Sequence, residues 1–399
     1  MEFDPTSMAF FEDPWDTYRW LRDEQPMYHH ERLNFWAVSR YDDCFEVHRD
    51  AATFSSTRGV TLDQLRSAAF GEAVAEVGSL IMMDPPRHDR MRRLVSRAFT
   101  PRRVAAWEPI VARVVGRALD GLAGADAFDA VVDFAGPFPI EIICEIVGIP
   151  AADRQQIRHW TDATLERDVG SPFPTASGIE AAIAQGRYML ALVADRRRHP
   201  ADDMIGHLLE AEVEGDDGGV ERLDDRAVAG FVSLLTAAGA ETVTKLVGNG
   251  VMAFAEHPGE QDRLRADPGL AGSAVEEVLR YRAPAQYAGR FCVADWERHG
   301  TTIPAGSPVL VLIGAASRDP RAYDDPDRFD IGREGPPTIT FGHGVHFCIG
   351  AHLARLEGRT AFTELYRRWP ALDVDLDRVR WVHMTNVAGP SSVPVSARG

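Results

Sequence analysis

One cysteine of this chain lies in a setting that suits chemistry. Cys348 falls within residues 341–350, which read Phe-Gly-His-Gly-Val-His-Phe-Cys-Ile-Gly, directly before a predicted amphipathic helix over residues 351–369. Exposed N–H groups at a helix N-terminus favour a thiolate. The glycines let the backbone approach a flat, bulky group, because glycine has no Cβ. The segment therefore indicates a sulfur atom held against a ligand.

Three roles are open to Cys348. A nucleophile needs a base within hydrogen-bonding distance, whereas a metal ligand needs an apolar wall and N–H donors directed at sulfur. A lone cysteine is most often a structural core residue. Phe341, Phe347 and Ile349 supply an apolar wall, so the complete ten-residue pattern favours the metal-ligand interpretation.

A basic pair lies in the N-terminal quarter of the chain. His88 and Arg92 are four residues apart in a predicted helix that opens with Asp84 as its N-cap and proline in its first turn. Their side chains share one helix face, which suits a ligand that bears carboxylates. The alternative is a solvated basic helix, the commoner interpretation of an isolated His/Arg pair.

A long apolar helix is predicted over residues 224–257 and must run through the core. The pentapeptide Ala-Gly-Ala-Glu-Thr at residues 238–242 places an acid, Glu241, in its middle. Thr242 can hydrogen-bond back to the carbonyl of Ala238, which predicts a local bulge or groove beside a hydroxyl and a carboxylate. Alternatively, Glu241 is a structural acid paired with a distant arginine, and the glycine is a helix-packing contact.

Composition limits the class of protein. The 399 residues carry a formal net charge of -17, which argues against a general nucleic-acid or membrane-surface binder. No run of about 18 apolar residues predicts a membrane span, and the N-terminal segment lacks the features of a signal peptide, so we expect a cytoplasmic protein. The four scattered cysteines predict neither disulfides nor a zinc ribbon. No linker divides residues 1–399, so we expect one domain.

Residues 341–350 resemble the haem-thiolate loop of the cytochromes P450, Phe-x-x-Gly-x-His/Arg-x-Cys-x-Gly, at every fixed position. Residues 238–242 resemble the family's I-helix motif, and Glu277 with Arg280 resembles its structural K-helix pair. The resemblance extends over nearly the whole chain. It implies a mainly α cytochrome P450 fold with a smaller β-rich region, a haem b cofactor and monooxygenation with O2.

The resemblance also implies a role for each site residue. Cys348 would be the axial iron ligand, and Thr242 and Glu241 would deliver protons during dioxygen cleavage. The side chains implied to hold the haem propionates are His88, Arg92, Arg290 and His346. The remaining residues implied to contact the cofactor are Phe341, Gly342, Ile349 and Ala238.

Family position further implies which stretches surround a substrate. These stretches are largely apolar, which favours a lipophilic small molecule such as a terpenoid, steroid, fatty acid or polyketide-like compound. Gln286, Tyr287 and Asn386 are candidate polar anchors. The stretches are residues 60–83, the region near Leu235 and Ala238, residues 285–289 and residues 384–387.

Electrons must come from outside this sequence, because it holds no flavin or iron–sulfur motif. The resemblance implies a monomer served by a ferredoxin and ferredoxin reductase, and an acidic ferredoxin would suit a basic patch. The arginines that could form this patch are Arg93, Arg97, Arg102, Arg103, Arg355 and Arg359. Two rival functions are a peroxide-driven haem-thiolate peroxygenase and a non-catalytic haem-binding sensor or carrier.

Overall fold

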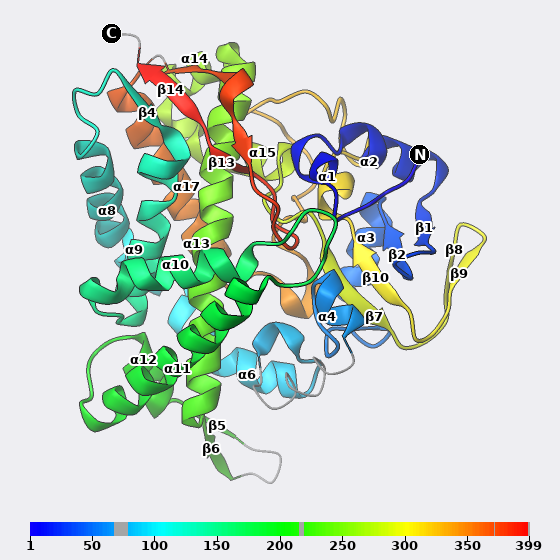
Figure 1. Ribbon diagram of the computed structural model, residues 1–399, viewed down its shortest axis with the longest axis horizontal. Coiled ribbons are helices and arrows are strands. Elements are labelled where there is room, and N and C mark those ends of the chain that lie inside the picture. The colour runs from blue at the N-terminus through cyan, green and yellow to red at the C-terminus, as the bar shows by residue number, and fades with distance from the viewer. Residues whose placement is uncertain (68–78, 215–218, 371, 398–399) are drawn as a thin grey trace.

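Helices make up most of the fold, and a smaller β-rich region packs at one side of them (Figure 1). This arrangement confirms the mainly α fold class expected from the sequence. The computed structural model describes residues 1–67, 79–214, 219–370 and 372–397.

The helices vary in length from four residues to 32. Their bounds are α1 Met8–Glu12, α2 Trp15–Glu24, α3 Tyr41–Arg49, α4 Leu62–Arg66, α6 Arg87–Ser96, α7 Pro101–Ala106, α8 Glu108–Asp120, α9 Pro137–Val147, α10 Arg154–Leu165, α11 Ala176–Arg198, α12 Met204–Glu210, α13 Asp225–Glu256, α14 Pro258–Ala266, α15 Ala271–Tyr281, α16 Ile313–Ala316 and α17 Ala351–Arg368.

The strands are short. Their bounds are β1 Met27–His30, β2 Phe35–Val38, β3 Phe54–Ser55, β4 Ala127–Asp129, β5 Glu212–Glu214, β6 Val220–Arg222, β7 Ala288–Cys292, β8 Trp296–Arg298, β9 Thr301–Ile303, β10 Pro308–Val311, β11 Leu372–Val374, β12 Arg380–Trp381, β13 Pro390–Ser392 and β14 Pro394–Ala397.

Helix α13 is the central element, with α8 to α12 on one side and the β-rich region on the other (Figure 1). It begins where the Asp224 side chain accepts a hydrogen bond from the Ala227 N–H, and it ends before Pro258. The predicted helix over 224–257 is thus confirmed. By length and composition α13 could also cross a membrane, but 56% of its most apolar window is buried inside the fold, as in a core helix.

Close contacts lock α17 against α13. A Cβ added to Gly250 of α13 would lie 2.2 Å from Phe362 of α17, and one added to Gly358 of α17 would lie 3.0 Å from Leu246 of α13. The two backbones can approach this closely only because glycine has no side chain. Since Cys348 lies three residues before α17, this packing places the cysteine segment against the middle of α13.

The largest sheet has five strands in the order β1-β2-β10-β7-β3. Strand β10 pairs with β2 in parallel and with β7 in antiparallel orientation, and Val309 lies opposite Arg290. This pairing positions Arg290 on an inner strand, where only 4% of the residue is exposed. The sheet therefore supplies the third side of the space between α13 and the cysteine segment.

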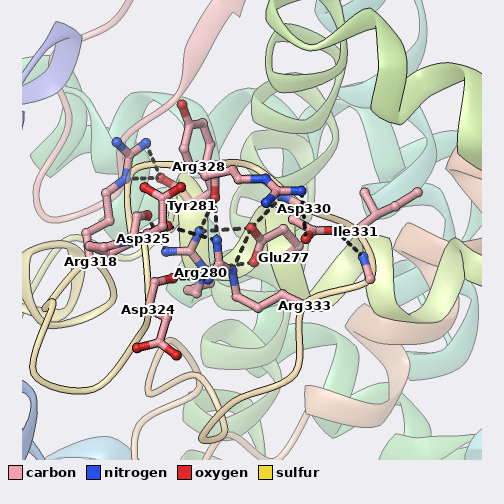
Figure 2. Close-up of polar contacts among 12 residues, drawn as sticks. Glu277, Arg280, Tyr281, Arg318, Asp324, Asp325, Arg328, Asp330, Ile331 and Arg333 are labelled. Atoms are coloured by element: carbon pink, nitrogen blue, oxygen red, sulfur yellow. Dashed lines mark hydrogen bonds and ion pairs between the residues drawn. The ribbon is translucent and has the colours of Figure 1, made fainter.

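A buried ion-pair network joins α15 to the chain that leads into the cysteine segment (Figure 2). Glu277 and Arg280 are each 3% exposed and lie 2.7 Å apart. Arg333 adds a second contact to Glu277 at 3.2 Å, and Arg280 also donates to the carbonyl of Pro326. A buried pair needs such additional hydrogen bonds to offset its desolvation. The burial of this pair and its bonds to neighbouring segments agree with the structural role that the resemblance implies.

The start of α6 differs from the prediction. Pro86, not Asp84, is the N-cap of this helix, and no side chain of the described residues caps it. The Asp84 carboxylate instead accepts a hydrogen bond from the Ser56 N–H at 2.9 Å. The Asp84 side chain therefore does not cap the helix that follows it, because it bonds to the backbone of a segment distant in sequence.

Candidate active site

An apolar cavity of about 320 Å³ separates the cysteine segment from α13. This volume falls within the range of small-molecule sites, roughly 300–1,000 Å³. Residues from the predicted site line both walls. On the cysteine side they are Phe341, Gly342, His346, Cys348 and Ile349, and on the α13 side they are Leu235, Ala238 and Thr242.

The cysteine segment folds back on itself around Cys348. The Cys348 N–H donates to the Phe341 carbonyl at 2.9 Å, and Gly342 and Gly344 adopt φ values of 69° and 70°, which favour glycine. Burial raises the pKa of the Cys348 thiol, while the N–H of Gly350 and the positive charge of Arg92 oppose that rise. The protein thus provides the N–H donors that a thiolate ligand requires. Burial disfavours the thiolate charge, and a bound metal cation would offset that cost.

The apolar wall expected around sulfur is only partly formed by the predicted residues. Phe341 and Ile349 line the cavity, and the Arg355 guanidinium lies 4.5 Å from the centre of the Phe341 ring. Phe347 does not line the cavity and is 36% exposed. Its carbonyl, rather than its ring, faces a site residue, because Arg92 donates to that oxygen at 2.6 Å.

Imidazole nitrogens without partners gather at one edge of the cavity. The Nε2 atoms of His88 and His346, and both ring nitrogens of His48, are buried and have no hydrogen-bond partner among the described residues. The His88 and His346 rings lie 4.5 Å apart between centroids, and Arg290 lines the same cavity. Buried polar groups without partners are rare in folded proteins. This edge therefore fits the carboxylates of a haem.

The charges of this edge repel one another when no anion is present. Burial and the Arg290 guanidinium lower the pKa of His346 to about 3. Burial also lowers the pKa of Arg290 to about 10, against the opposing effect of Asp84. Anionic propionates would reverse both effects, because a nearby negative charge favours the protonated form.

His88 and Arg92 lie beside the cavity rather than in its wall. The Asp89 carboxylate lies 3.0 Å from His88 Nδ1, which leaves Nε2 free to face the cavity edge. Arg92 is held by the Phe347 carbonyl and is partly buried. The structure thus joins both predicted residues to the cysteine segment, and neither is a solvated residue of a basic helix.

The side chain of Thr242 faces the cavity, whereas that of Glu241 does not. Thr242 Oγ1 donates to the Ala238 carbonyl at 2.7 Å and lines the cavity, as predicted. Glu241 does not line the cavity and pairs with Lys245, 2.9 Å away and one turn further along α13. Its partner is therefore not a distant arginine. The sequence predicts a bulge or a groove here. The helix is α-helical throughout, so no bulge forms, but Ala238, Gly239 and Thr242 line the cavity along this face of the helix, as a groove would.

Two further acids near the site escaped prediction from the sequence. Glu357 of α17 lines the cavity, and burial raises its pKa well above the ordinary value. Asp162 of α10 lies near Glu241, and burial and the Glu241 carboxylate raise its pKa to about 6. Lys245 and His48 also escaped prediction. The spacing of four between Glu241 and Lys245 could have predicted their ion pair, whereas nothing in the sequence indicated that His48 or Glu357 lines the cavity.

The predicted polar anchors for a substrate are already engaged within the protein. Gln286 does not line the cavity and accepts a hydrogen bond from the Tyr18 hydroxyl at 2.6 Å. Tyr287 and Asn386 do line it, but the Asn386 amide donates to the Tyr287 carbonyl. Of the predicted stretch 60–83, Val60 and Ile81 line the cavity, and residues 68–78 lie outside the described residues.

Comparisons with known proteins agree with this site. The sequence profile of the cytochrome P450 family matches residues 270–377. Putative cytochrome P450 123 of Mycobacterium tuberculosis is 43% identical over 99% of this chain and 96% of its own length. The methyl-branched lipid omega-hydroxylase of the same organism is 40% identical over 84% of this chain and 78% of its own length.

A solved structure shows the same fold. Cytochrome P450 CYP109Q5 from Chondromyces apiculatus superimposes with a TM-score of 0.89 at 34% identity, over 99% of this chain and 98% of that protein. These are haem-thiolate proteins by family. The chain belongs to the cytochrome P450 family and is a monooxygenase of that family.

Proposed function

We propose that this protein uses haem b to hydroxylate or epoxidise a lipophilic small molecule, with O2 as the oxygen source and a ferredoxin with its reductase as the electron source. One observation carries the proposal. An apolar cavity has Cys348 in one wall and the Thr242 hydroxyl in the other. A cofactor held at the first wall would face a substrate and the Thr242 hydroxyl at the second.

The residues at the cavity edge would hold the cofactor. Cys348 would ligate iron, and His88, Arg92, Arg290 and His346 would bind the two propionates through charge-assisted hydrogen bonds. When bound, the haem supplies the redox chemistry by which one oxygen atom enters a C–H or C=C bond and the other leaves as water. Phe341 and Ile349 would keep water from the sulfur.

Residues of α13 would deliver protons to the site. Thr242 Oγ1 is a hydroxyl at the cavity surface, and its own proton is directed to the Ala238 carbonyl, so its lone pairs remain available to hold a water. Glu241 is buried on the neighbouring helix face and is fixed by Lys245. Proton transfer through a hydroxyl, an acid and ordered water is the means by which a buried site receives protons.

The substrate class follows from the apolar wall. Leu235, Val243 and Ile313 line the cavity, together with Ile81 and Phe99. The Asn386 side-chain amide donates to the main-chain carbonyl of Tyr287, so these two residues offer few free polar groups to a substrate. A lipid is the favoured class, in agreement with the name of one relative, the methyl-branched lipid omega-hydroxylase.

The cysteine assignment is tested by Cys348→Ser. We expect this variant to lose the red-shifted absorption band of the ferrous carbon monoxide complex that marks the family, because serine supplies no thiolate. Cys292→Ser is the matched control, since Cys292 is buried in β7 and bonds to the Ala294 carbonyl. An unchanged band in Cys348→Ser would overturn the proposal.

Substrate and electron source are tested together. We expect branched-chain fatty acids to shift the haem absorption spectrum more strongly than steroids or macrolides of similar solubility. Any binder is then incubated with ferredoxin, reductase and NAD(P)H, or with hydrogen peroxide alone. Product formed only with peroxide would refute the ferredoxin assignment and favour the peroxygenase. Binding without product under both conditions would favour a sensor or carrier.

A further inference from the structure

His48 is a buried histidine of the cavity wall that is not among the four residues assigned above to the haem propionates. It lies in the last turn of α3, is 3% exposed and lines the same cavity as Cys348 and Arg290. Neither of its ring nitrogens has a hydrogen-bond partner in the part of the chain that the structure describes. Leaving a buried donor and acceptor unpaired is costly, so the ring requires a partner.

The position of the His48 ring is fixed by packing rather than by its own hydrogen bonds. A Cβ on Gly344 would lie 2.6 Å from the His48 carbonyl oxygen, so α3 presses on the cysteine segment where only glycine fits. A Cβ on Gly342 would lie 3.8 Å from His48 Cε1. The rings of Phe45 and His343 pack 4.1 Å apart between centroids and form a second contact between α3 and this segment.

The opposite end of α3 is held as well. The hairpin of β8 and β9 places Arg298 at 3.1 Å and His299 at 2.7 Å from the Asp43 carboxylate. Trp296 donates to Glu46 at 3.2 Å. These contacts hold α3 against the fold, which keeps the backbone of His48 in place beside the cavity.

Among the described residues, the charged neighbours that shift the pKa of His48 are all basic. Burial lowers the pKa of His48 well below its ordinary value, and Arg290, His343 and His346 lower it further. Within the described residues, Arg290 donates from one guanidinium nitrogen, to the Gly289 carbonyl. The four side chains therefore present more donors than acceptors, which is the arrangement that binds a carboxylate.

We propose that His48 is a further haem-binding residue, which donates a hydrogen bond to a haem propionate beside Arg290 and His346. This inference rests on the proposed haem site. It adds a ligand from α3, an element that contains none of the residues assigned from the family resemblance. A neutral imidazole can donate from one nitrogen, and the propionate's charge would favour a second proton on the ring.

The inference is tested with haem-loaded protein of three variants. His48→Phe keeps the ring shape without donors, and His48→Gln retains a donor. His30→Phe is the matched control, because His30 is 2% exposed in β1 and does not line the cavity. The measurements are the rate of ferric haem transfer to apomyoglobin, the ferric/ferrous potential and the propionate bending modes in resonance Raman spectra.

We expect His48→Phe to release haem roughly tenfold faster than the wild type, the usual scale for a lost hydrogen bond to a charged group. Its potential should shift to lower values and its propionate modes should move, because the propionate loses a donor. His48→Gln should recover most of each effect, and His30→Phe should show none. A purely structural role would change stability but would leave the potential and the Raman modes at their wild-type values.

The inference is overturned if His48→Phe matches the wild type in potential and Raman modes, or if His30→Phe releases haem equally fast. If His48→Phe does not fold, His48→Asn takes its place, because its shorter side chain withdraws the donor. A lowered potential and shifted propionate modes in His48→Asn support the inference, and wild-type values of both overturn it. The carbon monoxide band separates this inference from the proposed function. A variant with weaker haem retention and a normal band leaves Cys348 as the ligand, whereas wild-type protein without the band refutes the haem site itself.

Discussion

Burial governs the ionisable side chains around the cavity. It lowers the pKa of His346 to about 3 and that of Arg290 to about 10, and it raises the pKa of Glu357 and Cys348. Each shift disfavours the charged form of its group. A cofactor that brings two carboxylates to the imidazole edge and a cation to the sulfur would restore these charged forms at both places.

Thr242→Ala should separate oxygen consumption from product formation. The substitution removes the hydroxyl at the cavity surface but keeps the helix, so substrate should still bind with an unchanged spectral shift. We expect product per NAD(P)H to fall roughly tenfold or more, with peroxide released instead, because proton delivery loses its last group. The measurement is the ratio of product and peroxide to NAD(P)H consumed.

Thr244→Ala is the control for this prediction. Thr244 lies two residues along α13, is buried, and bonds to the carbonyls of Ala135 and Ala240 away from the cavity. Its ratio of product to NAD(P)H should equal that of the wild type. Unchanged coupling in Thr242→Ala would contradict the assignment of Thr242 to proton delivery.

Glu357→Gln should change how stability depends on pH. Burial raises the pKa of Glu357 above its ordinary value of 4.5, so the folded protein retains a proton that the unfolded chain releases above that pH. The free energy of unfolding therefore falls as pH rises above 4.5, by at most about 1.4 kcal/mol per pH unit, until the folded pKa is reached. Glutamine has no such proton.

We therefore expect Glu357→Gln to gain stability relative to the wild type between about pH 5 and about pH 7. Guanidinium unfolding of the haem-loaded proteins at both pH values measures the difference. An equal difference between the two proteins at both pH values would show that Glu357 keeps its charge when folded.

At the scale of elements, α13 combines two tasks on adjacent faces. One face carries Ala238 and Thr242 in the cavity wall, and the next carries the buried pair of Glu241 and Lys245. Lys245 also donates to the Pro390 carbonyl at 3.1 Å and so connects α13 to β13. The acid beside the site is thus part of the contact between the helix and the C-terminal strands.

Lys245→Met should destabilise the protein strongly. The substitution leaves the Glu241 carboxylate buried without its counter-ion, and breaking a buried pair costs about 3–5 kcal/mol. Denaturant unfolding gives the free energy of unfolding. Adding Glu241→Met should recover most of the loss, because replacing both members of a buried pair by apolar residues is often neutral. A double variant as unstable as Lys245→Met would show that the Pro390 contact, not the ion pair, matters.

At the scale of the whole molecule, negative net charge coexists with an exposed group of arginines. Arg93, Arg97, Arg102 and Arg103 are exposed on and after α6, and no ion pair joins them to the described residues. Two other predicted members are partly neutralised, since Arg355 pairs with Glu276 and Arg359 with Glu108. The basic surface is therefore centred on α6 and α7 rather than on α17.

Arg97→Glu should weaken the use of ferredoxin, the electron donor proposed above. Reversing an exposed charge slows electrostatically steered association, so we expect the KM for ferredoxin to rise several-fold with kcat at saturating ferredoxin unchanged. The KM should also become less sensitive to salt. Arg187→Glu is the control, because it makes the same change of charge at an exposed site on α11. Equal effects of both variants would place the ferredoxin contact elsewhere.

The sequence by itself determined the features that depend on neighbours along the chain. The course of α13 and α17 and the bond from Thr242 to Ala238 follow from apolar periodicity and a spacing of four residues. The glycines around Cys348 likewise indicated a close approach. Only the tertiary structure decided which partners distant segments supply. Packing turned Asp84 to the Ser56 N–H, held Arg92 on the Phe347 carbonyl and brought His48 to the cavity. Local hydrogen bonds need only adjacent turns, whereas burial and pairing depend on elements that meet after the chain has folded.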